Sequence, residues 1–324
     1  MNSSPDLNPA RRSRELQQLA GEGVDLLVIG GGITGCGVAL DAASRGLSVA
    51  LLEREDLASG TSGFSSKLVH GGLRYLAQGQ FGVAAESARE RHHLMTTIAP
   101  HLIEPVASVI PFDGSNSRLE RATLRIGYKL GDGLRRSAGT PRELLGRSHR
   151  INAFEASSRI PGLKTQGLDG ALIGWDGRLE DDARLVIAVA RTAAAHGAKI
   201  ITRCAATAVE RGQVSARDEL TGESLTIRAG HTINATGVWS GELASGVRVT
   251  PSKGSHVIVT AQSMGNPAGS LTLPAQGGGA KYVFAIPTAD QTVMIGLTDT
   301  EYEGGLSAPP QADDWETDLL LGAI

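Results

Sequence analysis

The stretch that decides the fold is VDLLVIGGGITGCGVALDAASRGLSVALLE, residues 24–53. It begins with an apolar run of β-strand type over 24–29, which meets the glycine-rich segment 30–35. A helical pattern follows, and a second apolar run ends on the acid Glu53. A strand, a glycine-rich turn, a helix and a second strand followed by an acid form the unit that binds dinucleotides. The segment therefore predicts a dinucleotide site.

The residues of this unit have separate physical roles in the predicted site. Gly30 allows the tight turn, Gly32 lacks a Cβ that would keep a pyrophosphate from the backbone, and Gly35 lets the helix pack closely on the sheet. The helix N-terminus adds free N–H groups and a partial positive charge. Glu53 can accept hydrogen bonds from both hydroxyls of an adenosine ribose and would repel a 2′-phosphate, which disfavours NADP. A glycine-rich turn in another kind of α/β protein is the alternative interpretation.

The residues that follow Glu53 favour FAD over NAD. An NAD domain would soon enter another strand–helix unit, whereas residues 57–72 form a loop rich in small hydroxyl side chains. Such a loop can surround a flavin with backbone N–H and hydroxyl donors. A flexible surface loop is the alternative, but Leu68 and Val69, with Leu73 and Leu76 directly after them, make this stretch too apolar for a free loop.

Five segments together resemble the FAD-dependent glycerol-3-phosphate dehydrogenases. They are SSKLVHGGLRYL (65–76), DDARL (181–185), NATGVW (234–239), KGSH (253–256) and IGLTDTEYEG (295–304). They occur in the order and at the spacing of the family, and the resemblance covers nearly the whole chain after its first two dozen residues. NATG alone is shared by many flavin oxidases.

The resemblance implies an α/β fold in which a Rossmann-like FAD-binding domain is interleaved with an antiparallel-sheet substrate domain. The family continues well beyond the point where this sequence stops, and its later segments supply an arginine and a lysine for the substrate phosphate. We therefore expect a truncated chain, a partial gene product or a premature stop rather than a short functional form, with impaired activity and weak FAD retention. The expected limits are 1–23 for a flexible tail, 24–110 and 165–245 for the FAD-binding domain, 111–164 and 246–310 for the substrate domain, and 311–324 for an incomplete helix.

The resemblance and the glycine-rich motif together imply a set of flavin-binding positions. These are Gly30, Gly32, Thr34, Gly35, Glu53, Thr61, Ser62, Ser65, Ser66, Lys67, Leu68, Ala206, Ala235, Thr236 and Gly237.

Three residues are the candidates for catalysis. His256 is the candidate base, because an imidazole can take a hydroxyl proton near neutral pH; a hydrogen-bonded histidine within a sheet is the alternative. Arg74 can bind a phosphate with two hydrogen bonds, and Tyr75 can bind a hydroxyl or phosphate oxygen; a surface ion pair is the alternative for Arg74. Lys253 is a weaker phosphate candidate or a solvated side chain.

Two adjacent acids, Asp181 and Asp182, are explained by the N-terminus of a helix and are not assigned to catalysis.

Composition and charge exclude several other classes of protein. The net charge is −3 and no basic–aromatic motif occurs, so we expect no nucleic-acid partner. The two cysteines, Cys36 and Cys204, have no second cysteine nearby, and no metal site is expected. No stretch is apolar enough to cross a bilayer.

One segment, residues 118–136, is basic and amphipathic. It is typical either of a helix on an anionic membrane surface or of a solvated helix face. The resemblance favours membrane contact, and it implies a cytoplasmic protein that is peripheral on the inner face of the cell membrane.

The resemblance implies oxidation of sn-glycerol 3-phosphate to dihydroxyacetone phosphate, with a hydride passed to FAD and electrons then passed to quinone. Two alternatives stay open at this point. One is an oxidase that uses oxygen as its electron acceptor and acts on glycerol 3-phosphate or on an amine. The other is a non-catalytic remnant of the same flavin fold.

Overall fold

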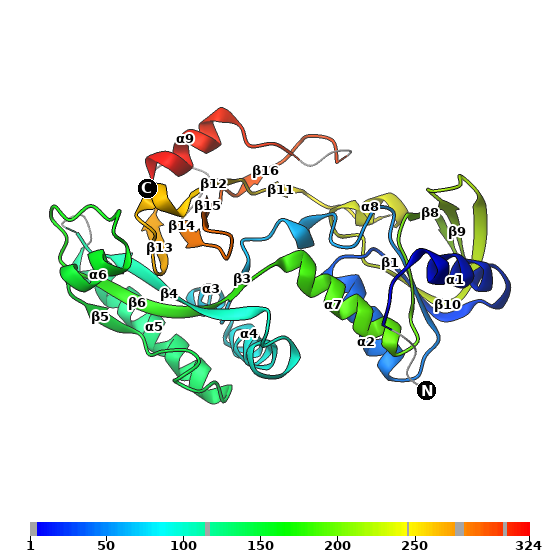
Figure 1. Cartoon of the computed structure of the whole chain (residues 1–324), viewed down its shortest axis with the longest axis horizontal. Coiled ribbons are helices and arrows are strands. Elements are labelled where there is room, and N and C mark those ends of the chain that lie inside the picture. The colour runs from blue at the N-terminus through cyan, green and yellow to red at the C-terminus, as the bar shows by residue number, and fades with distance from the viewer. Residues whose placement is uncertain (1–4, 114–116, 245, 276–281, 307–309) are drawn as a thin grey trace. The chain divides into compact units, whose positions relative to one another are not determined.

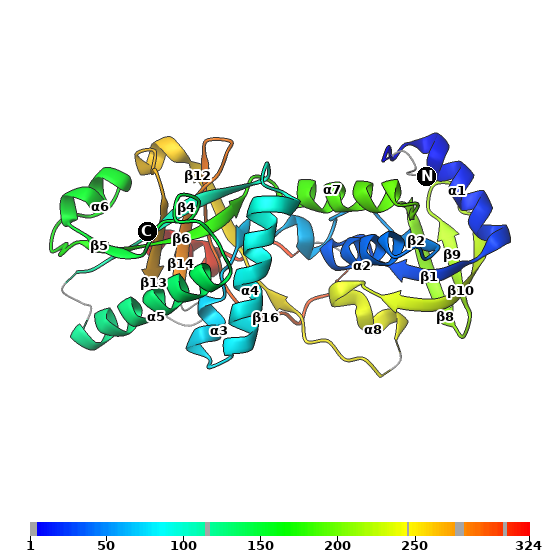
Figure 2. The same cartoon turned by 90° about the horizontal axis from the view of Figure 1, so that it is seen from below.

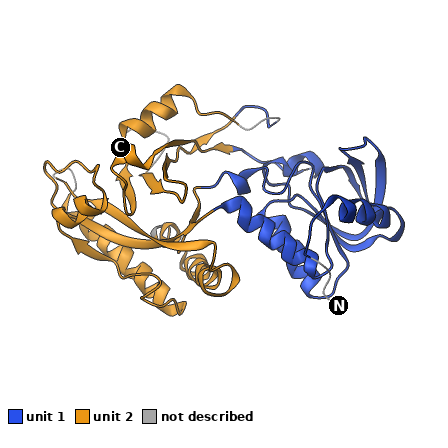
Figure 3. Cartoon of the chain, in the orientation of Figure 1, with its two compact units in different colours: residues 1–65, 181–251, 303–309 blue, residues 66–180, 252–302, 310–324 orange. Residues whose placement is uncertain are grey.

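The chain forms two compact units in the computed structural model, which describes residues 5–113, 117–244, 246–275, 282–306 and 310–324 (Figures 1 and 3). Unit 1 comprises residues 1–65, 181–251 and 303–309, and unit 2 comprises residues 66–180, 252–302 and 310–324. The domain limits predicted at 110 and 165 differ from these boundaries. Residues 66–110 and 165–180 belong to unit 2, because the strands within them pair in its sheet.

Unit 1 contains a six-stranded sheet with the order β7-β2-β1-β10-β9-β8. The strands from β7 to β10 run parallel, and β9 and β8 continue the sheet in antiparallel fashion. The elements of the unit are α1 (Pro9–Glu22), β1 (Val24–Ile29), α2 (Ile33–Ser44), β2 (Val49–Leu52), α7 (Asp182–Ala195), β7 (Lys199–Ile201), β8 (Cys204–Glu210), β9 (Gln213–Asp218), β10 (Ser224–Asn234) and α8 (Ser240–Leu243).

Helices cover both faces of this sheet. Alternate residues of β1 point to opposite faces, so β1 contributes to a core on each side. Leu26 and Val28 pack with α2 and α7, which lie side by side (Figure 2). Leu27 and Ile29 pack on the other face, where Leu19 of α1 joins the same core. A strand buried on both faces reads as the continuous apolar run seen in the sequence.

The flexible tail predicted for residues 1–23 is wrong for residues 9–22, which form α1. Leu19 is buried, and the buried Arg11 pairs with Glu15 at 2.7 Å. Arg12 pairs with Asp218 of β9 at 2.6 Å. The helix is polar in sequence because paired charges line its contact with the sheet. The rest of the predicted tail includes residues 1–4, which lie outside the described residues.

β10 is a single strand that includes both residues 225–228 and residues 231–234. It pairs antiparallel with β9 in its first half and parallel with β1 in its second half. A Cβ at Gly230 would lie 3.0 Å from the carbonyl oxygen of Asp25, so the two strands approach closely there. β7 pairs parallel with β2, at the other edge of the sheet from β8 and β9.

Unit 2 contains an eight-stranded sheet with the order β12-β15-β14-β13-β4-β6-β3, and β5 also pairs with β6. Only β13 and β4 are parallel among these described pairs. The elements are β3 (Leu68–Val69), α3 (Leu73–Ala77), α4 (Phe81–His93), β4 (Ile103–Pro111), α5 (Arg118–Ser137), β5 (His149–Ile151), α6 (Ala153–Arg159), β6 (Ala171–Leu179), β11 (Ser252–Lys253), β12 (His256–Thr260), β13 (Ser270–Pro274), β14 (Tyr282–Pro287), β15 (Thr292–Gly296), β16 (Thr300–Glu301) and α9 (Asp314–Gly322).

This second sheet also has a core on each face. Val109 of β4 belongs to the core that includes residues of α6 and Leu320 of α9. The neighbouring Ile110 packs on the other face with Phe112 and with Leu124 of α5. Figure 2 shows α3, α4 and α5 beside one another. No helix in the described parts of the chain is long and apolar enough to span a bilayer.

Candidate functional site

The glycine-rich turn between β1 and α2 depends on two glycines for its shape. Gly30 has a φ of +112°, a conformation that side chains rarely adopt, and a Cβ there would overlap the carbonyl of Ala235. A Cβ at Gly35 would overlap the carbonyl of Gly30. The close approach predicted for Gly35 therefore occurs, but its partner is the turn itself and not the sheet.

Gly32 leaves space at the N-terminus of α2. The atoms within 4 Å of a Cβ placed there belong to Ser62, whose Oγ would be 3.1 Å away. The Ser62 hydroxyl accepts the N–H of Ile33 at 3.0 Å, and Thr34 beside it is exposed. Since the first N–H groups of a helix have no partner within it, this end of α2 is suited to an anion such as a diphosphate.

Glu53 lies at the end of β2 and is held against the turn. Its carboxylate accepts the N–H of Gly31 at 2.6 Å and the N–H of Glu55 at 2.7 Å, one on each oxygen. Each oxygen keeps a further lone pair for a ribose hydroxyl. The N–H of Cys204 donates to the Glu53 carbonyl at 2.8 Å, which brings the start of β8, the strand of Ala206, to this point.

The NATG segment returns to the same edge of the sheet after β10. The N–H of Ala235 donates to the carbonyl of Ile29 at 2.8 Å, and Asn234 accepts the Thr236 hydroxyl at 2.6 Å. Gly237 follows with a φ of +58°. The glycine turn and this segment therefore meet at the carboxyl ends of parallel strands, where open α/β sheets bind ligands.

The hydroxyl-rich loop begins in unit 1 and is anchored there. Thr61 and Ser62 form a 3₁₀ turn over Thr61–Gly63. The backbone N–H and hydroxyl of Ser65 donate to Asp182 at 2.9 and 2.8 Å. Asp181 caps α7 by accepting the N–H of Arg184 at 3.1 Å. Asp182 thus anchors the loop and Asp181 caps the helix. Both contacts are structural, in agreement with the expectation that neither acid is catalytic.

The rest of the predicted loop lies in unit 2, where it meets the KGSH segment. The carbonyl of Lys67 accepts the N–H of Leu179 at 2.7 Å, and Leu68 pairs within β3. The hydroxyl of Ser66 lies 3.0 Å from Nε2 of His256. The His256 ring lies over Gly296, because a Cβ on that glycine would overlap the ring. Two segments of the family signature are therefore joined in one unit.

Arg74 and Tyr75 are both exposed on α3, in the same unit as His256. Because both side chains are exposed, a charged substrate could reach them.

Lys253 is buried, so the alternative of a solvated lysine side chain is wrong. Its ammonium lies 2.5 Å from Asp313 and 2.8 Å from Glu316. Glu316 also accepts hydrogen bonds from the hydroxyls of Ser255 and Thr298, at 3.0 and 2.7 Å. Burial raises the pKa of Glu316, but the bonds from Lys253 and the neighbouring groups outweigh it and lower the pKa to about 2. Lys253 therefore fastens α9 to β11 instead of facing a ligand.

One cluster in unit 2 has no counterpart in the sequence predictions. Asp176 of β6 accepts hydrogen bonds from His70 at 3.1 Å and from Arg91 of α4 at 2.5 Å. No motif marks Asp176 or Arg91, because their relation to His70 depends on the folded sheet and helix.

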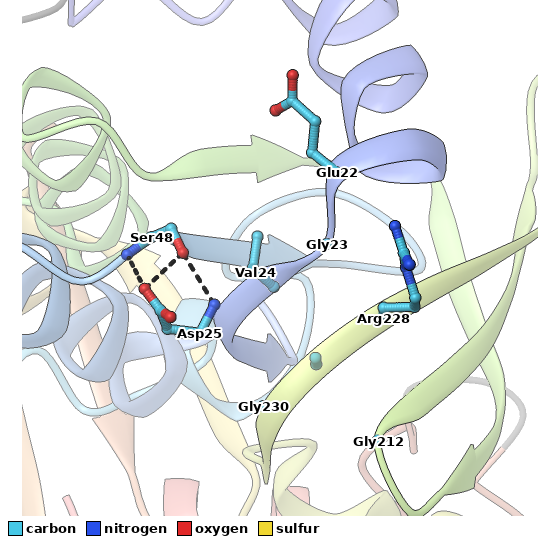
Figure 4. A pocket seen from close by; sticks show the side chains of 9 residues that line it. Glu22, Gly23, Val24, Asp25, Ser48, Gly212, Arg228 and Gly230 are labelled. Atoms are coloured by element: carbon cyan, nitrogen blue, oxygen red, sulfur yellow. Dashed lines mark hydrogen bonds between the residues drawn. The ribbon is translucent and has the colours of Figure 1, made fainter.

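A pocket at the opposite end of the unit 1 sheet is a poor cofactor site. It is lined by residues at the start of β1 and along β10, and Figure 4 shows Asp25 bonded to Ser48 on one side and the Arg228 side chain on the other. The carboxyl ends of the parallel strands, not these amino ends, carry the glycine turn. Among the described residues no group of three or more histidine, cysteine or acidic side chains could hold a metal.

The glycine turn, the acid at the end of β2 and the parallel sheet define unit 1 as a dinucleotide-binding α/β fold of the kind found in flavin oxidoreductases. Residues 25–324 match the model of the FAD dependent oxidoreductase family, and the chain belongs to that family. FAD is therefore the cofactor of the family, and the free space at Gly32 and the open lone pairs of Glu53 fit its diphosphate and ribose.

The chain is similar to several glycerol-3-phosphate dehydrogenases. It is 48% identical over 325 residues to glycerol-3-phosphate dehydrogenase 1 of Mycobacterium tuberculosis, covering 100% of this chain and 63% of the relative. A crystal structure of the glycerol-3-phosphate dehydrogenase from Bacillus halodurans complexed with FAD matches with a TM-score of 0.73 at 28% identity, over 97% of this chain and 55% of that one. The L-α-glycerophosphate oxidase from Mycoplasma pneumoniae shares the fold, with a TM-score of 0.63 at 18% identity over 92% of this chain and 78% of that one. The chain thus spans less than two thirds of the length of the two dehydrogenases.

Proposed function

We propose that this chain is the FAD-binding and substrate-binding part of a glycerol-3-phosphate dehydrogenase. The complete protein would oxidise sn-glycerol 3-phosphate to dihydroxyacetone phosphate. The observation that carries the proposal is the 3.0 Å contact between Ser66 and His256, because it joins the SSKLVHGGLRYL and KGSH segments in unit 2. The names of the relatives that match the whole chain support the same substrate.

FAD, when bound, accepts the hydride that leaves C2 of the substrate. In the proposal the turn at Gly30–Gly35 and the N-terminus of α2 hold its diphosphate, and Glu53 holds its ribose. Thr61, Ser62 and the NATG segment complete these positions in unit 1.

His256 is proposed as the group that takes the proton of the C2 hydroxyl. In the tautomer with an unprotonated Nε2, the Ser66 hydroxyl donates to that nitrogen, as the 3.0 Å distance allows. A substrate hydroxyl that displaces the Ser66 hydroxyl from this nitrogen can give up its proton there, because the nitrogen has a single lone pair. The ring is positioned for this because it lies over Gly296, which has no side chain to displace it.

Arg74 and Tyr75 are proposed to bind the phosphate end of the substrate. The guanidinium matches two phosphate oxygens and the phenol can donate to a third. Lys253 is not included, since its ion pairs with Asp313 and Glu316 occupy it.

Quinone is the proposed electron acceptor, and α5 is the proposed contact with an anionic membrane surface. Leu119, Ile126 and Leu130 are 76%, 59% and 50% exposed and follow one another at intervals of 7 and 4 residues, so they form one stripe. The exposed cations Arg118, Lys129 and Arg136 form a second stripe at intervals of 11 and 7. An apolar stripe beside a basic one suits the interface of an anionic bilayer.

Three other cations of α5 turn inward, which the sequence did not indicate. Arg121 and Arg125 lie 5.3 and 5.9 Å from the ring of Phe112, and the buried Arg135 donates to the carbonyl of Thr140 at 2.6 Å. The surface charge of the helix therefore comes from fewer cations than the sequence suggests.

Anaerobic mixing of sn-glycerol 3-phosphate with a chain completed by the C-terminal part of the M. tuberculosis relative tests the proposed reaction. We expect bleaching of the bound flavin by this substrate, and reoxidation by a quinone analogue. Bleaching by an amine, or fast release of hydrogen peroxide in air, would instead support an oxidase. Full flavin binding without bleaching by any of these substrates would support a non-catalytic remnant.

A further inference from the structure

Glu53, the acid proposed to hold the adenosine ribose, is fixed through its backbone as well as its carboxylate. Its N–H donates to the carbonyl of Ile201 at 2.8 Å, and its carbonyl accepts the N–H of Cys204 at 2.8 Å. Between these two bonds, the N–H of Arg203 donates to the carbonyl of Glu55 at 3.0 Å. The connection from β7 to β8 therefore sets the position of this acid at the end of β2.

That connection depends on contacts from elsewhere in unit 1. β7 has three residues and lies at the edge of the sheet, where β2 is its neighbour. Arg203, which follows it, has a φ of +55°, in the left-handed region that residues other than glycine rarely adopt. A backbone conformation of this kind persists only where the surrounding structure holds it.

Arg12 of α1 supplies such contacts. Its guanidinium donates to the carbonyl of Thr202 at 2.8 Å and to the carbonyl of Arg203 at 3.0 Å. Asp218 of β9 accepts two further hydrogen bonds from the same guanidinium, at 2.6 and 3.2 Å, and so fixes its orientation. The side chains of Arg12 and Asp218 are 14% and 5% exposed, which shields these bonds from water. A planar guanidinium can serve a carboxylate and two carbonyls at once, and an ammonium cannot.

α1 also holds the other end of β7. The buried Arg11 donates to the carbonyls of Ala194 and Ala198, both at 3.2 Å, and Ala198 directly precedes the strand. Two adjacent arginines of one helix are thus bonded to the backbone on both sides of β7. The helix therefore braces the segment that carries the contacts to Glu53.

We propose that Arg12 is a positioning residue for FAD binding, which keeps Glu53 in place for the adenosine ribose by bracing the connection between β7 and β8. This inference rests on the proposed ribose contact of Glu53. Arg12 acts through that acid and is not itself a ligand of FAD, because four hydrogen bonds direct its guanidinium at protein groups. Helix α1 thus contributes to cofactor affinity although it lies outside the dinucleotide-binding motif.

ADP tests the proposal in the 324-residue chain, because it carries the adenosine ribose and the diphosphate without the flavin. The comparison ligand is an ADP analogue that lacks the 2′ and 3′ hydroxyls of the ribose. Arg12→Ala should weaken ADP binding about three- to tenfold and leave binding of the analogue unchanged. Arg14→Ala, which removes an exposed cation of the same helix, should change neither affinity. NMR titration of each variant with the two ligands measures both.

A double variant, Arg12→Ala with Glu53→Ala, separates positioning from an independent effect. If Arg12 acts through Glu53, removing Arg12 from the Glu53→Ala chain should cause no further loss of ADP affinity. Hydrogen exchange in the ligand-free chain gives a second readout. The N–H groups of Glu53 and Cys204 should exchange faster in Arg12→Ala than in Arg14→Ala, because the segment that bonds them has lost its brace.

Equal weakening of ADP and of its analogue in Arg12→Ala would overturn the positioning role, since a general loss of structure affects both ligands. Unchanged ADP affinity in Arg12→Ala, or losses that add fully in the double variant, would overturn it as well. The ribose contact itself is tested by Glu53→Ala. If that substitution weakens both ligands equally, the ribose contact is wrong and the positioning role falls with it. If Glu53→Ala weakens ADP alone and Arg12→Ala weakens neither ligand, only the positioning role is wrong.

Discussion

The ammonium of Lys253 lies 2.8 Å from the carboxylate of Glu316 in the interior of unit 2, and this pair fastens α9 to the strand β11. The neighbouring Ser255 and Thr298 hydroxyls donate to the same carboxylate. Since removing one member leaves a buried charge short of a partner, the pair has a measurable effect on stability.

Glu316→Gln should lower the free energy of unfolding by about 3 kcal/mol at pH 7, because Lys253 keeps only Asp313 as a charged partner. The folded pKa of Glu316 is about 2, below its usual value, so its stabilising effect is present at neutral pH and is lost as the pH falls below about 4.5. Urea unfolding followed by circular dichroism at pH 7 and pH 3 measures both effects. Asp318→Asn changes an exposed acid of the same helix and should have little effect. A pH-independent difference for Glu316→Gln would contradict the assignment.

Gly32→Val should abolish FAD binding, because the branched side chain would fill the space beside Ser62 where the diphosphate is proposed to lie. The φ of Gly32 is −78°, which valine adopts freely, so the loss should occur without unfolding. Gly37→Ala is the matched control, since nothing lies within 4 Å of its added Cβ. The measurement is the visible flavin spectrum of protein reconstituted with FAD. Full flavin occupancy in Gly32→Val would remove this glycine from the site.

Glu53→Ala should weaken FAD binding about ten- to a hundredfold, because it removes a charged acceptor for the ribose hydroxyls. It also removes the 2.6 Å bond that holds Gly31 in the turn. Quenching of FAD fluorescence on titration with protein gives the affinity. Glu55→Ala, a change of a neighbouring exposed acid, should leave the affinity close to that of the unchanged chain. Equal effects of the two substitutions would mean that Glu53 does not contact the ribose.

His256→Ala should lower the rate of flavin reduction by about two to four orders of magnitude, because it removes the proposed base for the hydroxyl proton. The measurement needs a chain completed with the C-terminal part of the M. tuberculosis relative, and FAD binding should stay intact. Ser66→Ala should have a smaller effect, since it removes only the 3.0 Å partner of the ring. Flavin reduction at the unchanged rate in His256→Ala would leave His256 with a structural role alone.

Reversing two exposed charges of α5, Lys129→Glu with Arg136→Glu, should weaken binding to vesicles of anionic phospholipid about thirtyfold or more. Sedimentation with vesicles measures the bound fraction at low and at physiological salt. Arg211→Glu with Arg248→Glu makes the same change of net charge at exposed positions of unit 1. Equal weakening by the two pairs would show that overall charge, and not α5, governs the contact.

The β1–α2–β2 unit could be predicted from the sequence, because its strand is apolar throughout and its glycines are fixed by the turn. α1 could not, since its contact with the sheet is made by paired charges such as Arg11 and Glu15. The boundary near residue 66 was also missed, because strand pairing in unit 2 decides it.

The candidate site divides in the same way. Its motifs predicted the turn and His256, whose surroundings follow from nearby sequence. Lys253 pairs with a residue more than 50 positions away in the chain, at the start of α9. His70 is hydrogen-bonded to Asp176, more than 100 positions away. No local sequence pattern indicates either contact.

The most direct test of the central claim is anaerobic reduction of bound flavin by sn-glycerol 3-phosphate, measured in the completed chain and in the 324-residue chain side by side. The account predicts a yellow completed protein whose flavin is bleached by this substrate, with weak FAD retention and little or no bleaching in the shorter chain. A completed protein that binds FAD fully and is not bleached by glycerol 3-phosphate would contradict the account.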